Sequence, residues 1–190
     1  MLLASGLGPR DAAGDDVRNL MLSPTAGVDP LMLFDTRPLA AQVLESLETT
    51  PRLHELSAKF AVQMDGGEGL AMLEHHHDVW LSPLRLDDEI WLAFGLAGCP
   101  ADDSPLGAVP LAQGHELVLA VLNRFLDLAR PEQTRMRHLL LEQSPTDVVA
   151  GLGLEVRADS SVLQWRRKTT TGGDYLGSYP QQQAGMSAVG

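Results

Sequence analysis

The feature that most constrains the fold is a pair of apolar segments, residues 78–84 and 89–96, separated by the short polar stretch 85–88. Each segment is rich in residues typical of strands and contains one tryptophan, Trp80 or Trp91. Two such runs joined by a few polar residues are typical of an antiparallel hairpin. We therefore expect a hairpin that turns at residues 85–88, with both indole rings in the core.

Strand and helix signals alternate around this hairpin. Residues 17–22 and 59–64 have the pattern of strands. Apolar positions spaced by three and four residues predict a helix over 38–47 and further helices within 113–152. The Gly-, Pro- and Asp-rich residues 98–112 are expected to form a loop. The order strand, helix, three strands, helices predicts an α+β fold: a mixed sheet covered by helices.

The two ends of the chain differ from this central pattern. Residues 1–13 resemble the end of a helix running into a loop, because Gly6 suits a C-terminal cap and Pro9 prevents continuation, so we expect the natural start to lie upstream. Residues 157–190 lose apolar periodicity and contain Thr/Gly- and Gln-rich stretches, as in a linker or disordered tail. One domain is expected between them, over residues 14–156.

Composition limits the function. A formal net charge of −11 disfavours general binding to nucleic acid or to anionic membranes. No apolar run reaches the roughly 18–20 residues of a membrane span, and a cytoplasmic location is expected. The single cysteine, Cys99, cannot form an internal disulfide, and one thiolate is too few for an iron–sulfur cluster, which normally takes four. We expect Cys99 to be a small apolar filler.

Two arginines bracket a turn that contains Gly and Pro. Arg18 is followed by Asn19, and Arg37 lies at the start of the predicted helix. A guanidinium group matches a carboxylate through two parallel hydrogen bonds, so the pair suits a ligand with several carboxylates. The alternative is structural: Arg18 pairs with the aspartates just before it, and Arg37 pairs with Asp35.

Lys59 lies at the start of the predicted strand 59–64. Its ammonium group could face a ligand anion or donate a proton. The alternative is a solvated lysine at the edge of a sheet.

Three consecutive histidines, His75, His76 and His77, raise the question of a metal site. Alternate strand residues share a face, so His75 and His77 could ligate together while His76 could not. Because matches to such short motifs are often fortuitous, we expect loop histidines or a turn before the strand and no metal site.

The order of these pieces resembles the siroheme-dependent sulfite and nitrite reductase superfamily. The pieces are Arg18-Asn19, Ser-Pro-Thr-Ala-Gly at 23–27, Asp29-Pro30, Leu-Ser-Ala-Lys-Phe at 56–60, His77-Asp78 before a strand and the Arg-rich stretch 135–141. Within the superfamily, residues 14–19, Asp29-Pro30, 35–40 and the Asp-Gly-Gly turn at 65–67 look like precorrin-3B synthase.

The resemblance implies a ferredoxin-like α+β half-domain that pairs with a second, similar half. It implies oxygen-dependent conversion of precorrin-3A to precorrin-3B, a hydroxylation with lactone formation in aerobic cobalamin biosynthesis. The implied cofactor is a [4Fe-4S] cluster, with an additional iron as a further option. The cluster cysteines of such enzymes lie in the second half, so this chain alone should hold no cluster and should be inactive without N- and C-terminal parts of the enzyme.

The resemblance also suggests roles for individual residues. Arg18 matches an anion-binding arginine accompanied by Asn19, and Lys59 matches the first of two active-site lysines. The second lysine falls on Ala61, which disfavours reduction of a small oxyanion and suits a large tetrapyrrole. We expect Arg18, Asn19 and Arg37 to contact the carboxylates of precorrin-3A and Lys59 to act at the catalytic centre.

Two other readings stay open. The chain could be the same region of a siroheme nitrite or sulfite reductase. It could also be a non-catalytic module for tetrapyrrole binding or assembly.

Overall fold

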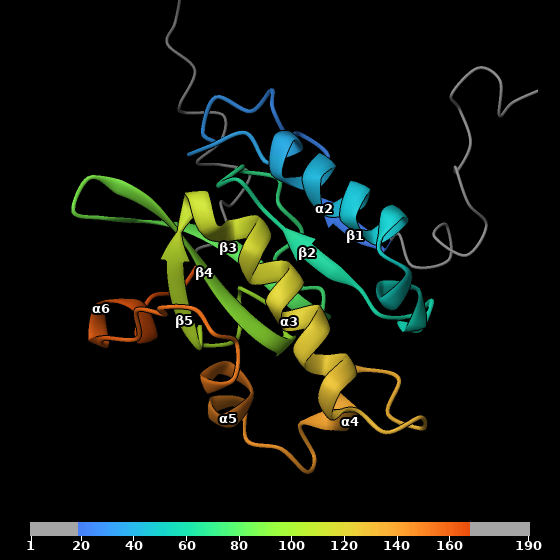
Figure 1. Ribbon diagram of the computed structural model, residues 1–190. Helices are drawn as coiled ribbons and strands as arrows, with labels where there is room; N and C mark the ends of the chain where they lie inside the picture. Colours follow the sequence, from blue (N-terminus) through green and yellow to red (C-terminus); the bar gives the residue numbers. More distant parts are fainter. Residues whose placement is uncertain (1–18, 168–190) are drawn as a thin grey trace, which may run out of the picture.

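The computed structural model describes residues 19–167 and contains a mixed five-stranded sheet (Figure 1). Its strands follow the order of the chain: β1 (Leu20–Leu22), β2 (Val62–Met64), β3 (His77–Leu86), β4 (Glu89–Gly98) and β5 (Gly107–Pro110). The strands β1, β2 and β3 are parallel, whereas β4 and β5 continue the sheet in antiparallel fashion. The predicted hairpin is β3–β4.

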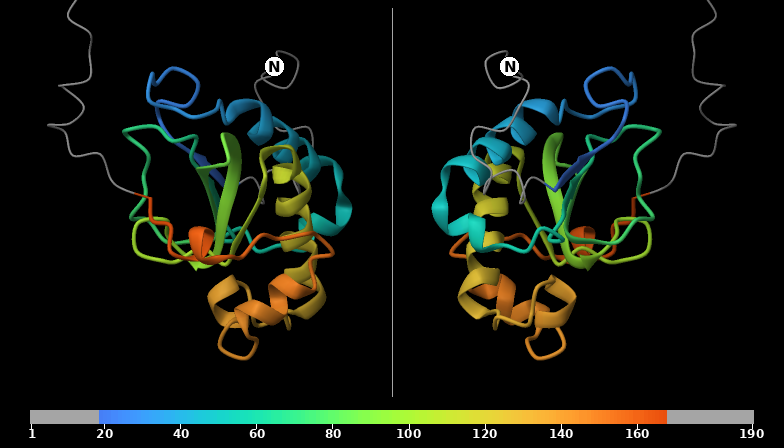
Figure 2. Two further views of the ribbon diagram at one scale, coloured as in Figure 1. Left: turned by 90° about the vertical axis from the view of Figure 1, so that its left-hand side faces the viewer. Right: turned by 90° about the vertical axis from the view of Figure 1, so that its right-hand side faces the viewer.

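Helices cover the sheet, as Figure 2 shows. Their bounds are α2 (Arg37–Thr49), α3 (Gly114–Leu128), α4 (Met136–Leu139), α5 (Pro145–Ala150) and α6 (Ser160–Leu163), with short 3₁₀ helices at Pro51–Glu55 and Leu111–Gln113. Apolar stripes on α2 and α3 pack against one face of the sheet and form the main core. The α+β fold with a helix-covered mixed sheet is therefore confirmed. None of the helices in the described part of the chain is long and apolar enough to cross a membrane.

The opposite face of the sheet has a smaller core built on Trp80. This side chain is fully buried and lies over Gly95 on the neighbouring strand, where a Cβ atom would collide with the indole ring. Val162 of α6 packs into the same cluster. Trp91 is only partly buried, and the guanidinium of Arg157 lies 5.5 Å from its ring centroid. Both tryptophans were expected in the core, and only Trp80 is fully buried there.

Three local predictions differ from the structure. The expected loop 98–112 contains β5, which pairs with β4 through its backbone and needs no strong apolar pattern. Lys59 lies in a turn, since β2 begins only at Val62. The folded body continues past residue 156: Arg157 pairs with Ala108, and α6 follows.

The ends of the chain lie partly beyond the described residues. The helix end expected at 1–13, the residue Arg18 and the tail from 168 onward all fall there. Of the expected linker or tail, residues 157–167 are described, and they pack against the sheet.

Candidate functional site

A hollow of about 610 Å³ opens at the edge where the three parallel strands begin. Parallel strands start at the same edge of a sheet, which brings together residues far apart in the sequence. The lining residues are Asn19, Leu20, Met21, Leu22, Lys59, Ala61, His77 and Arg135. None of these residues is acidic, although the chain carries a net charge of −11.

Asp78, the second residue of β3, holds one wall of this hollow in place. Its carboxylate is 2% exposed and accepts hydrogen bonds from Arg135 Nε at 2.8 and 3.0 Å. It also accepts from the backbone N–H of Met136 at 2.7 Å and from that of Ala61 at 2.9 Å. One buried carboxylate thus joins the starts of β2, β3 and α4. The bonds to Asp78 use Nε of Arg135, and both terminal guanidinium nitrogens lack a protein partner among residues 19–167.

Lys59 also lines the hollow. Asn19 Nδ2 donates to the carbonyl of Ala58, and the Lys59 backbone N–H donates to Ser57 Oγ at 3.2 Å, so the turn is tied to the start of β1. The Lys59 side chain is exposed, and in the described part of the chain it forms no ion pair. Asn19 therefore positions the lysine turn.

His77 also lines the hollow and is buried. Its Nδ1 lies 2.8 Å from the carbonyl oxygen of His75. Because that oxygen can only accept, Nδ1 carries the proton and Nε2 of the neutral ring is an acceptor. Burial lowers the pKa of His77, which favours the neutral ring near pH 7.

The fold places the predicted site residues in different parts of the molecule. Asn19 and Lys59 line the hollow together, but Arg37 does not. Arg37 forms an ion pair with Asp35 at 2.7 Å, and this pairing lowers the pKa of the Asp35 carboxyl. The structural alternative for Arg37 is therefore what the fold displays, and its contact with a ligand stays a prediction. Arg18 lies outside the described residues.

Two lining residues, Arg135 and His77, were absent from the predicted site. Both belonged to recognised pieces, the Arg-rich stretch 135–141 and the His-Asp pair. The signal that could have found them is Asp78, because a buried aspartate needs a cation or several N–H donors.

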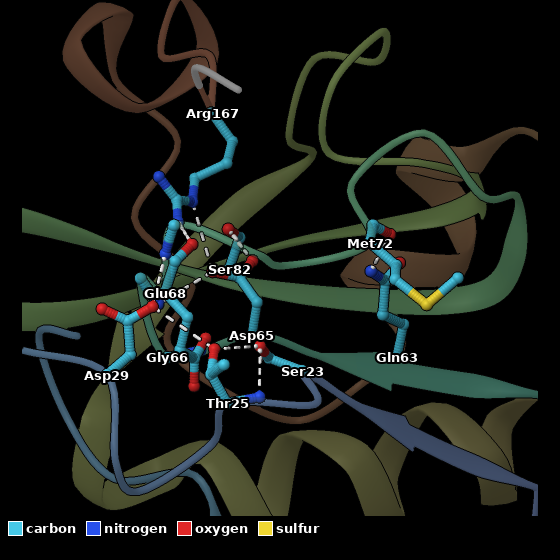
Figure 3. Close-up of polar contacts among 12 residues, drawn as sticks. Ser23, Thr25, Asp29, Gln63, Asp65, Gly66, Glu68, Met72, Ser82 and Arg167 are labelled. Carbon is cyan, nitrogen blue, oxygen red and sulfur yellow. Dashed lines mark hydrogen bonds and ion pairs between the residues drawn. The ribbon is translucent and has the colours of Figure 1, made fainter. Parts of the chain in front are cut away.

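A second polar cluster lies apart from the hollow and stabilises the loop after β2 (Figure 3). The buried Asp65 carboxylate accepts from Ser82 Oγ and pairs with Arg167 at 3.2 Å. Arg167 also donates to the backbone carbonyl of Glu68 at 2.8 Å, and the Glu68 side chain accepts from Gly66 N–H at 2.6 Å. Burial raises the pKa of both Asp65 and Glu68. These bonds hold the predicted Asp-Gly-Gly turn and anchor the segment after α6.

Comparison with known proteins gives a consistent family. The family model described as "Nitrite and sulphite reductase 4Fe-4S domain" matches residues 13–150. A chloroplastic ferredoxin–nitrite reductase of Zea mays is 30% identical over 220 residues, covering 100% of this chain and 36% of the relative. A ferredoxin–nitrite reductase of Synechococcus elongatus is 26% identical, with 100% and 40% covered.

A solved structure shares the fold. The Mycobacterium tuberculosis NirA protein aligns with a TM-score of 0.55 at 18% identity, over 70% of this chain and 26% of that protein. The chain spans 36% and 40% of the length of the two curated relatives above.

Proposed function

This chain belongs to the family of nitrite and sulphite reductase 4Fe-4S domains, and from that premise we propose that it forms one wall of a tetrapyrrole site in an oxidoreductase. The observation that carries the proposal is the hollow at the start of the parallel strands, which Lys59, Arg135 and the apolar strand β1 line together. The activity, substrate and partners of the whole enzyme are part of the proposal.

The lining of the hollow fits the chemistry of a tetrapyrrole with acidic arms. Leu20, Met21 and Leu22 offer apolar surface to the flat ring. Lys59 and the terminal nitrogens of Arg135 offer cations to carboxylates at its rim. Its volume of about 610 Å³ lies within the range of roughly 300–1,000 Å³ for small-molecule sites. The hollow would enclose part of the macrocycle, and further polypeptide would cover the remainder.

An iron–sulfur cluster fits the chain's own residues poorly. The family description names a [4Fe-4S] domain, yet the sequence has one cysteine. Cys99 is buried and does not line the hollow. Because such a cluster normally takes four thiolates, any cluster of the complete enzyme would need cysteines from other polypeptide.

The first candidate for the reaction is reduction of nitrite or sulfite at siroheme, and the ferredoxin–nitrite reductase relatives support it. Bound siroheme would supply the iron that passes electrons to the substrate. Lys59 and Arg135 would hold carboxylate arms or the oxyanion, and the acceptor nitrogen of neutral His77 would orient a proton-bearing group.

The second candidate is precorrin-3B synthesis, and Ala61 is the observation that favours it. Ala61 lies in the hollow beside Lys59, where the resemblance places a second active-site lysine. A methyl group there lowers the positive charge available to a small oxyanion and leaves space for a bulkier ring. On this reading the arms of precorrin-3A take the cationic positions, and Arg18, Asn19 and Arg37 are the further contacts to test.

The two candidates separate in one experiment on the protein in its complete natural form. We would measure siroheme content, nitrite and sulfite reduction with a chemical electron donor, and conversion of precorrin-3A under oxygen. Siroheme with oxyanion reduction selects the first candidate, and precorrin-3A conversion selects the second. Tetrapyrrole binding with neither reaction selects the assembly module. Absence of any tetrapyrrole binding would refute the proposed site, and unchanged binding after Arg18→Ala would remove that residue from it.

A further inference from the structure

A histidine, a cysteine and an aspartate converge outside the hollow, at the end of the β3–β4 hairpin that is remote from its turn. A ligand atom of each of His76, Cys99 and Asp102 lies within 4.8 Å of the other two. None of the three lines the hollow. We propose that they bind a divalent metal ion of the zinc class.

The sheet register explains how two of the ligands meet. His77 lies opposite Gly98 in the antiparallel β3–β4 ladder, so His76 and Cys99 are the next facing pair, just beyond its end. His77 is the first residue of β3 and lines the hollow, whereas His76 precedes the strand and is not among the lining residues. We expected His76 to be the histidine excluded from a shared site with His75 and His77. The fold instead brings it close to a cysteine that directly follows the next strand, β4.

The loop after β4 brings in the third ligand. Two hydrogen bonds between Asp103 and Cys99 close this loop. The Asp103 carboxylate accepts from Cys99 N–H at 2.8 Å, and the Asp103 N–H donates to Cys99 O at 3.1 Å. A Cβ at Gly98 would collide with the Asp103 carboxylate, so this closure needs glycine. Ala101 N–H also bonds the carbonyl of Leu73 at 3.2 Å, which fixes the loop against the segment leading to His76.

The three donor types select the metal. A thiolate, an imidazole nitrogen and a carboxylate oxygen are all ligands of Zn²⁺, and three protein ligands leave a fourth tetrahedral position for water. His76 and Asp102 are exposed and Cys99 is buried, so an ion would sit at the surface over a protected sulfur. The Cys99 thiol donates to Asp102 Oδ2 at 3.5 Å, and the metal would replace this proton.

The test uses Co²⁺ as a spectroscopic probe for Zn²⁺ in the full, metal-free chain. We expect one equivalent of Co²⁺ to produce a near-ultraviolet thiolate-to-cobalt band that Zn²⁺ then removes. Cys99→Ser should abolish this band. His76→Ala and Asp102→Asn should each weaken Zn²⁺ binding by at least about tenfold, because losing a ligand should cost no less than losing a supporting residue. His75→Ala is the matched control: it removes an exposed neighbouring histidine outside the cluster and should leave the affinity unchanged.

Two results would overturn the site. One is the absence of a thiolate band in a chain whose circular dichroism shows the α+β fold. The other is an equal loss of affinity in His75→Ala and His76→Ala, which would mean adventitious binding by the histidine run. Neither result bears on tetrapyrrole binding, because the two sites share no residue.

Discussion

Replacing Asp78 by Ala should destabilise the fold and loosen the hollow. The carboxylate is 2% exposed and is the common acceptor for Arg135, Met136 and Ala61. Its removal leaves the buried N–H of Met136 and the partly buried N–H of Ala61 without acceptors, at about 1–3 kcal/mol each, with Ala61 at the lower end because water can reach it.

The lost ion pair adds to this cost. Arg135 keeps 20% of its side chain exposed, so solvent offsets much of the roughly 1.5–3 kcal/mol that a hydrogen bond to a charged group contributes. We therefore expect Asp78→Ala to lower the free energy of unfolding by about 3 kcal/mol, at the low end of the ~3–5 kcal/mol typical of a broken buried pair. Arg135→Ala should cost less, since Asp78 keeps both backbone donors.

Urea unfolding with an unchanged slope measures this difference. Asp127→Ala is the matched control, because Asp127 also pairs with an arginine, Arg52, but both side chains are about half exposed. Such a pair contributes roughly 0–1 kcal/mol. If Asp78→Ala costs no more than Asp127→Ala, Asp78 does not hold this corner of the sheet.

Three further changes test other parts of the structure. Burial lowers the pKa of His77 below its usual 6.5, so on acidification the unfolded chain binds a proton before the folded chain does, and the free energy of unfolding falls. His77→Asn should therefore lose less unfolding free energy than the unaltered chain between about pH 7.5 and about pH 5.5, and an equal loss in the two proteins would contradict this. Gly95→Ala should cost about 1–3 kcal/mol in urea unfolding, because its methyl group collides with Trp80, and a neutral effect would mean that the ring can move. Arg167→Ala should cost about 1–3 kcal/mol, because buried Asp65 loses its cation but keeps Ser82 and the Gly67 N–H as donors, and a loss below about 1 kcal/mol would show that the segment after α6 contributes little.

The elements with strong periodicity could be predicted from the sequence. The β3–β4 hairpin and helices α2 and α3 bury continuous apolar patterns, which local sequence displays directly. Strand β5 and helix α6 could not be predicted in the same way. They have four residues each, and backbone pairing with β4 and packing of Val162 beside Trp80 hold them in place.

The site was only partly predictable for a related reason. Lys59 and Asn19 were identified through resemblance, and the fold places them in one hollow. Arg135 lies 57 residues from Asp78, so their pairing depends on tertiary structure that no local pattern reveals. The ion pair of Arg37 could be predicted, because its partner Asp35 is only two residues away and the sequence alone displays both residues.

Titration of the protein in its complete natural form, freed of tetrapyrrole, with siroheme, followed by visible absorbance, tests the cationic hollow most directly. Lys59→Gln should weaken binding by about tenfold, as expected for the loss of a charged hydrogen bond of about 1.5 kcal/mol. Arg52→Gln removes an exposed cation that does not line the hollow and should leave the affinity unchanged. Equal affinities for the unaltered chain and Lys59→Gln would contradict the assignment of this hollow to a tetrapyrrole.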